Sequence, residues 1–337
     1  MVHFVRKEIG SEFWSVPVTQ EANHFFPAET QWFLSGRSAL ECLIAEIGKQ
    51  HDFRSVAIPA WCCDSMVKPF LDAGIEVRFY PVYVENGRFV QDYSDLQECD
   101  ALFLMDYFGY SGYSDAHNFQ GIRIRDLTHS IFSGNYTDAH FYFGSLRKWA
   151  GFYTGGFGWG FDPMPLPNNN AYSALRREAM NRKESYITGK SDSKEYLTVF
   201  SKAEDLLEQC TPAQADERDV MQAAVLNVEQ MRHRRRENAA HLLETFSDIA
   251  VFPELGQNDC PLFVPVLVPD GKRDALRRFL IDHEIYCPVH WPLTEYHSPD
   301  SQTMKIYRNE LSLVCDQRYS REDMDRLIKT IRKFWGE

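Results

Sequence analysis

The sequence has no apolar stretch long enough to span a bilayer, and no apolar secretory segment opens the chain. It also has no excess of basic residues, because 36 Lys and Arg stand against 48 Asp and Glu for a net charge of -12. Nucleic acids and anionic membranes both bind basic surfaces. We therefore expect no nucleic-acid partner and no membrane association, and any anionic ligand must be bound by local donors.

Zinc-type cysteine spacing is absent as well. The eight cysteines form no CxxC pair and no short cluster with histidine, so we expect no metal site. Several lie in apolar runs, where a free thiol packs as a small hydrophobe, and this usage favours a reducing cytoplasm. No GxGxxG follows a predicted first strand, which disfavours a nucleotide-binding oxidoreductase.

What the sequence does contain is a series of short β-rich apolar runs between residues 53 and 161, separated by loops or helical stretches. This pattern is typical of a mostly parallel, doubly wound α/β sheet. Ligands of such sheets bind beyond the strand ends. The expected strands are 56–58, 76–80, 101–105, 122–126, 141–143 and 156–159.

Helical periodicity flanks this region on both sides. Apolar residues recur at helical spacing over 38–47, where Ser38 and Glu41 form a capping-box pattern. Residues 174–209 are polar and helical, and the basic run 232–236 is interpreted mainly as a solvated helix face. The later order of strand 263–268, helix 274–284, strand 311–315 and helix 321–334 predicts a compact α+β unit. We expect a large domain at 1–230 and a smaller C-terminal domain at 231–337.

Two ionisable residues fall at the ends of neighbouring predicted strands. Asp126 closes one strand, and Lys148 follows the next and precedes Gly155-Gly156. A lysine buried beside a cofactor loses part of its proton affinity and can act as nucleophile and base, so Lys148 is suited to hold an aldehyde as a Schiff base. A carboxylate at Asp126 would keep a pyridine nitrogen protonated, which makes the ring an electron sink. The alternative for Asp126 is to cap the turn after its strand.

The start of the helix near Gly36 offers free N–H groups and the positive end of the helix dipole, which predicts a phosphate site at Arg37, Ser38 and Ala39. Ser145 either adds a hydroxyl to that phosphate or bonds to nearby backbone. His129 either packs against the pyridine ring of the bound cofactor or reaches the phenolic oxygen of that ring. The alternative is a histidine in the core whose nitrogens are hydrogen-bonded within the protein. Together these groups are what a pyridoxal phosphate (PLP) enzyme needs.

An aromatic residue follows the first sheet strand. Trp61 could cover one face of the cofactor ring, and a core position beneath the sheet edge is an equal alternative.

Several segments resemble, in order and over most of the length, the DegT/DnrJ/EryC1/StrS family of sugar-modifying PLP aminotransferases of fold type I. They are Gly36-Arg37-Ser38-Ala39-Leu40, Ile58-Pro59-Ala60-Trp61-Cys62, Tyr107-Phe108-Gly109, Asp126-Leu127-Thr128-His129, Lys148 with Gly155-Gly156, and Leu311-Ser312-Leu313. The chain departs from the family at three places. Phe143-Gly144 replaces the Ser-Phe pair before the lysine, Cys63 aligns with the ring-stacking aromatic, and His290-Trp291-Pro292 stands where relatives contact the sugar.

The resemblance implies a ping-pong transamination from glutamate to a keto sugar linked to a nucleotide, with PLP held at Lys148. Some relatives have histidine at that position and act as dehydratases, whereas the lysine is present here. It also implies a homodimer with the cofactor at the interface, and His290 and Tyr296 are interpreted as part of the acceptor pocket. The alternatives are another PLP reaction, with a different acceptor or an elimination, and a non-catalytic relative that keeps the fold.

Overall fold

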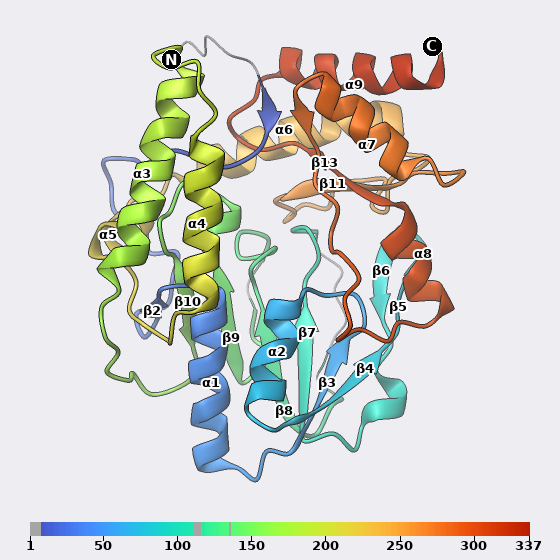
Figure 1. Ribbon diagram of the computed structural model, residues 1–337. Helices are drawn as coiled ribbons and strands as arrows, with labels where there is room; N and C mark the ends of the chain where they lie inside the picture. The colour runs from blue at the N-terminus through green and yellow to red at the C-terminus, as the bar shows by residue number, and fades with distance from the viewer. Residues whose placement is uncertain (1–7, 111–115, 117, 135) are drawn as a thin grey trace.

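A seven-stranded, mainly parallel sheet forms the centre of the molecule in the computed structural model, which describes residues 8–110, 116, 118–134 and 136–337 (Figure 1). Its strand order is β2-β10-β9-β8-β7-β3-β4. Strands β4, β3, β7, β8 and β9 are parallel, while β10 is antiparallel to both β9 and β2. All five residues of β7 are buried apolar residues, as expected of a parallel strand covered on both faces. The bounds are β2 Gln31–Phe33, β3 Ser55–Pro59, β4 Glu76–Tyr80, β7 Ala101–Met105, β8 Ile122–Asp126, β9 Phe141–Ser145 and β10 Gly156–Trp159.

Helices α1 (Gly36–Gln50) and α2 (Asp64–Asp72) lie side by side against the sheet (Figure 1). The α1 side chains Leu40, Leu43 and Ile47 are fully buried in the main core with β3 and β7. The predicted capping box at Ser38 is wrong, because Ser35 is the N-cap and its hydroxyl accepts from the Ser38 N–H at 3.1 Å. The helix therefore begins two residues earlier than its apolar periodicity indicated.

The polar region 174–209 is two helices rather than one. Helices α3 (Asn170–Ile187) and α4 (Tyr196–Glu208) pack side by side at one flank of the sheet (Figure 1). Gly189, with φ of +74°, lies in the connection between them, a conformation that favours glycine. The short helix α5 (Glu217–Ala224) follows.

The C-terminal part has its own hydrophobic core, made by α6, α7, α9 and the antiparallel pair β11 and β13. The predicted order of strand, helix, strand and helix is observed there. Strand β1 also joins this core through Ile9, because β1 pairs with β12. The proposed boundary at 230/231 falls inside α6, and the exact division remains a prediction. The bounds are β1 Ile9–Gly10, α6 Val228–Phe246, β11 Phe263–Leu267, α7 Arg273–Asp282, β12 Ile285–Tyr286, β13 Glu310–Val314 and α9 Arg321–Trp335.

A β-hairpin and helix α8 (Ser301–Asn309) lie between the large sheet and the C-terminal core. Strands β5 (Val82–Glu85) and β6 (Arg88–Gln91) form the hairpin, and α8 packs on it, with the Thr303 hydroxyl donating to the Val82 carbonyl at 3.0 Å. The fold is thus the expected α/β class, a large mainly parallel sheet followed by a smaller α+β unit. Within the described ranges, no helix has both the length and the apolar character needed to cross a membrane.

Candidate active site

A cavity of about 620 Å³ opens between the carboxyl ends of the sheet strands and the small C-terminal core. Asp126, His129, Ser145, Lys148 and His290 all line it. The parallel strands β8 and β9 bring the first four together, since both end at this edge of the sheet. The predicted lysine and carboxylate therefore share one cavity.

Lys148 is the last residue of a short 3-10 turn, η2 (Leu146–Lys148), directly after β9. The Ser145 hydroxyl accepts from the Arg147 N–H, and the Leu146 N–H bonds to the Gly155 carbonyl at 2.8 Å. The expectation of a buried lysine is wrong, because the Lys148 side chain is exposed to the cavity. No described residue forms a hydrogen bond or ion pair with its amine, which is therefore free to react.

Asp126 is the last residue of β8 and is almost fully buried. Its Oδ1 accepts from the Thr128 N–H at 2.7 Å, so the turn-capping role and a cavity-facing role coexist. Burial raises the pKa of Asp126 to about 6, and the Asp106 carboxylate contributes to the rise, while the Thr128 hydrogen bond and Lys148 oppose it. A cationic group bound beside this carboxyl would lower its pKa again and favour the charged form.

His129 follows in the turn after β8 and is 1% exposed. Its ring stacks on Trp291, with centroids 5.6 Å apart and planes at 19°. Burial, together with His290 and Lys148, places the pKa of His129 well below its usual range, so the ring is neutral. Its Nδ1 has no hydrogen-bond partner among the described residues, an unusual state for a buried nitrogen at a cavity wall.

The helix start lines the cavity with Ser35, Gly36 and Arg37. Of the predicted phosphate contacts, Arg37 lines the cavity and Ser38 and Ala39 do not. The Ser38 N–H donates to the Ser35 hydroxyl and the Ala39 N–H to the Ser35 carbonyl, so neither is free for a phosphate. The helix start, and with it the expected backbone donors, lies two residues earlier than predicted, while phosphate binding at this position stays a prediction. The N–H groups of Gly36 and Arg37, in the same first turn, have no partner among the described residues.

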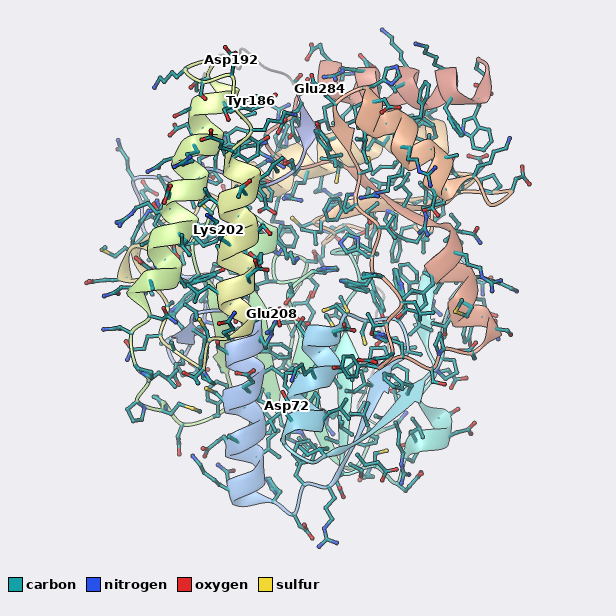
Figure 2. All side chains as sticks on the ribbon, in the orientation of Figure 1. Asp72, Tyr186, Asp192, Lys202, Glu208 and Glu284 are labelled. Carbon is teal, nitrogen blue, oxygen red and sulfur yellow. The ribbon has the colours of Figure 1, made fainter. Side chains whose placement is uncertain are left out.

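Arg37 reaches away from the helix end to the C-terminal end of α4. Its guanidinium donates two hydrogen bonds to the Glu208 carboxylate, one of them at 2.8 Å, and Figure 2 shows Glu208 where α4 meets α1. The Arg37 side chain is thus already paired, which leaves its backbone as the group offered to an anion.

Glycine at 156 explains how Ser145 reaches the helix start. A Cβ on Gly156 would lie 2.2 Å from the Ser35 carbonyl oxygen, so no larger residue fits there. A Cβ on Gly36 would lie 3.3 Å from the Ser145 Cβ, which places the serine against the helix end. Glycine at positions 36 and 156 thus lets the Ser145 side chain lie against the start of α1.

Trp61 does not face the cavity. It is fully buried, its indole N–H donates to the His290 carbonyl at 2.8 Å, and it stacks on Tyr107 with centroids 4.8 Å apart. The ring-covering role for Trp61 is therefore wrong, and the core alternative holds. Cys63, two residues later, lines the cavity, and its thiol lies 2.8 Å from the Ser65 hydroxyl.

The two residues interpreted as acceptor contacts separate in space. His290 lines the main cavity, whereas Tyr296 lines an adjoining pocket of about 520 Å³. The two pockets share Arg37, Cys63, Ser65 and Trp291 in their walls. Tyr296 thus stands in a side chamber rather than beside Lys148.

Sequence reasoning missed part of the positive charge in this cavity, namely Arg176, Arg235 and Arg277. Arg235 belongs to the basic run expected to be solvated, yet it is 0% exposed, with its guanidinium 4.7 Å from the centre of the Trp149 ring. Helical spacing was the available signal, because Arg235 shares a face of α6 with the buried Met231 and Leu242. The basic residues that line the cavity are Arg37, Arg147, Lys148, Arg176, Arg235, Arg277 and Arg318.

No family model matches the chain, and no curated protein matches it. Solved structures do. A DegT DnrJ EryC1 StrS aminotransferase from Brucella abortus has a TM-score of 0.61 at 18% identity, over 94% of this chain and 87% of that one. Helicobacter pylori PseC, an aminotransferase of pseudoaminic acid biosynthesis, has a TM-score of 0.63 at 14% identity, over 96% and 99%. The sugar aminotransferase CalS13 from Micromonospora echinospora has a TM-score of 0.58 at 16% identity, over 90% and 87%.

The chain therefore has the fold of the fold type I PLP-dependent aminotransferases. Within that class, these structural neighbours are sugar aminotransferases of the DegT/DnrJ/EryC1/StrS kind, as the sequence resemblance predicted. The neighbours also include a Streptococcus pneumoniae protein solved in PLP and PMP forms, with TM-scores of 0.63 and 0.61.

Proposed function

We propose that this protein is a PLP-dependent aminotransferase that moves an amino group from glutamate to a keto sugar linked to a nucleotide. The observation that carries the proposal is the shared cavity of Lys148 and Asp126, at the ends of two adjacent parallel strands. PLP, when bound, supplies an aldehyde for the lysine amine and an electron-accepting ring. The printed names of the structural neighbours support the same class of reaction.

The residues present fit this cofactor. Asp126 offers a buried carboxyl for a ring nitrogen, and the free Lys148 amine faces the same cavity. The unpartnered Nδ1 of His129 suits a neighbouring oxygen acceptor or donor. Ser145 and the start of α1 offer a hydroxyl and backbone N–H groups to a phosphate.

Within this proposal Lys148 acts twice. Its amine would hold the aldehyde of the bound cofactor and, once released, would take a proton from the substrate Cα as general base and return it as acid. The Asp126 carboxylate would face the ring nitrogen and would lower the cost of the negative charge that develops on the substrate. Trp149 fixes the lysine turn, because its buried indole N–H donates to the Thr128 carbonyl at 2.8 Å.

The charge of the cavity supports an anionic acceptor. Seven basic side chains line it against the four acidic side chains of Glu12, Asp126, Glu204 and Asp316, although the chain as a whole has a net charge of -12. Such a local reversal of sign attracts carboxylates and phosphates. This balance favours glutamate as donor and a phosphate-bearing sugar as acceptor.

The proposal also includes a homodimer whose neighbouring subunit completes the cavity, as the family resemblance implies. We also propose that the protein works in the reducing cytoplasm, because all eight cysteines are free thiols. Measuring the molar mass in solution by light scattering tests whether the protein is a homodimer.

An absorbance spectrum with added PLP tests the central assignment. We expect a visible band in the wild type that L-glutamate bleaches, and no such band in Lys148→Ala. Lys202→Ala is the matched control, because Lys202 lies exposed on α4 outside the cavity walls (Figure 2). Equal PLP binding by wild type and Lys148→Ala would reject the assignment and favour a non-catalytic relative, whereas a band that glutamate leaves unchanged would favour another PLP reaction.

A further inference from the structure

Strand β13 carries polar side chains at buried positions. Glu310 and Ser312 are both 0% exposed, and Val314, on the same side of the strand, lines the cavity. Leu311 and Leu313 point the other way into the small C-terminal core, because side chains alternate along a strand. A buried carboxyl is costly unless it is partnered, and the proposed reaction as described above gives Glu310 no task.

These two side chains form a chain of hydrogen bonds that ends at the cavity. The Ser312 Oγ lies 2.5 Å from Glu310 Oε1, and the His290 Nδ1 lies 2.9 Å from the same Ser312 Oγ. The His290 backbone N–H also donates to Glu310 Oε2 at 2.9 Å, which holds the carboxyl in place. No described residue hydrogen-bonds to the His290 Nε2, so this nitrogen remains for a ligand in the cavity that the ring lines.

His290 must stay neutral in this position. Burial, with a contribution from Lys148, lowers the pKa of His290 to about 3. A neutral imidazole carries one proton, on either Nδ1 or Nε2. If Nε2 gives its proton to a ligand, a second proton has to arrive at Nδ1 in the same event, and Ser312 is the group bonded there.

Glu310 can supply that proton. Burial raises the pKa of Glu310 to about 8, although the hydrogen bonds from Ser312 and the His290 N–H and the charge of Arg273 on α7 oppose the rise. The carboxyl therefore holds a proton at neutral pH. The other titratable groups that face these residues are Lys148, the Cys287 thiol, whose pKa is raised by burial and by Glu310, and the neutral His129, whose ring centre lies 5.5 Å from that of His290.

We propose that Glu310, Ser312 and His290 form a proton relay that protonates the departing oxygen of the keto substrate. This role rests on the proposed function, in which a carbonyl oxygen is replaced by nitrogen and leaves as water. The His290 Nε2–H bond breaks as the new O–H bond forms on that oxygen. The Ser312 proton passes to His290 Nδ1, and the Glu310 proton passes to Ser312 Oγ.

The step balances without any other reactant. One proton reaches the substrate oxygen, Glu310 becomes a carboxylate, and His290 changes from its Nε2–H to its Nδ1–H tautomer without ever becoming charged. Proton uptake at Nε2 reverses the same sequence and restores Glu310. The relay lets His290 donate a proton in a buried site, where the desolvation of a charged imidazolium would be unfavourable.

Nitrogen NMR of protein with ¹⁵N-labelled histidine tests the relay without cofactor. We expect the His290 ring, assigned by its loss in His290→Asn, to change from the Nε2–H to the Nδ1–H tautomer as pH rises through about 8. Glu310→Gln removes the titrating group, so the His290 tautomer should stay the same at every pH. His297, a buried histidine bonded to Thr294, is the internal control and should respond identically in both proteins. A tautomer that is constant in the wild type, or that still changes in Glu310→Gln, overturns the relay.

A single-turnover reaction of protein loaded with pyridoxamine phosphate and mixed with 2-oxoglutarate tests the chemical role. Glu310→Gln and Ser312→Ala should each slow this turnover about a hundredfold, the usual scale of a lost proton donor. Ser133→Ala, a buried serine bonded to the Gly109 carbonyl, should keep the wild-type rate. Equal rates in wild type and Glu310→Gln overturn the relay. A wild type that fails to react instead overturns the proposed donor, and the tautomer measurement alone then decides the relay.

Discussion

The side-chain amide of Gln317 donates to the carbonyl oxygen of Trp149 at 2.7 Å. Gln317 follows β13 in the small C-terminal core, and Trp149 follows Lys148 in the turn after β9. The same glutamine accepts from the Nε of the buried Arg235 at 2.7 Å. One side chain thus joins the turn that carries the lysine to the opposite wall of the cavity.

We expect Gln317→Leu to lower the free energy of unfolding by about 2 kcal/mol, because the variant leaves the Arg235 Nε and the Trp149 carbonyl without this partner. Urea unfolding followed by circular dichroism measures the change. Gln302→Leu, at an exposed position in the first turn of α8, is the control and should change stability little. A stability loss no larger than that of the control would mean that water replaces the amide at no cost.

Gly156→Ala should damage both stability and cofactor binding. Its Cβ would lie 2.2 Å from the Ser35 carbonyl oxygen, a backbone atom that cannot move without shifting the start of α1. Overpacking of this kind costs about 1–3 kcal/mol. Gly48→Ala is the matched control, because nothing lies within 4 Å of its Cβ and alanine favours the helix by about 1 kcal/mol. Denaturant unfolding and PLP titration should show opposite effects of the two variants on stability, and weaker PLP binding only in Gly156→Ala.

A buried arginine behind Asp126 should be essential for folding. Arg125 is fully buried and bonds to both the Asp106 and Asp138 carboxylates. Arg125→Met would leave two buried acids unpaired, and breaking a buried pair by removing one partner costs about 3–5 kcal/mol. Thermal unfolding measures the loss. Arg54→Met removes an exposed arginine paired with Asp52 and should leave the midpoint nearly unchanged, so equal effects would contradict this account.

Stability should depend on pH through Glu310. Burial raises the pKa of this carboxyl from 4.5 to about 8, so the folded state binds more protons than the unfolded state between these values. The contribution of Glu310 to stability is therefore fully present below pH 4.5 and is lost as pH rises through about 8. Wild type should lose stability relative to Glu310→Gln across this window, as measured by urea unfolding at a series of pH values. A constant difference would show that the pKa of Glu310 is the same in the folded and unfolded states.

The strands and the central pair of site residues could be predicted from sequence because they depend on local patterns. The run 101–105 is apolar at every position and forms the buried strand β7. Asp126 and Lys148 follow apolar strands directly, and parallel strands deliver such residues to one edge of a sheet. Helix starts were less predictable, because Ser35 and Ser38 are both suitable caps and only the packed helix distinguishes them.

Other outcomes depended on contacts between segments far apart in the chain. Trp61 is a plausible ring-stacking residue by its position after β3, but its indole N–H is held by the His290 carbonyl. Arg235 belongs to a run of charges that indicates a solvated face, yet Trp149 and the carbonyls of Pro261 and Leu262 hold it in the interior. Charge alone does not reveal such partners.

By itself, the sequence determined an α/β chain with a lysine and an aspartate at neighbouring strand ends, since apolar periodicity and strand-end position are local properties. Only the tertiary structure decided which helix-start donors are free, which aromatic residues face the cavity, and that His290 meets Ser312 and Glu310. These features arise when separate segments pack together, because a buried polar group must find its partner wherever the fold places one.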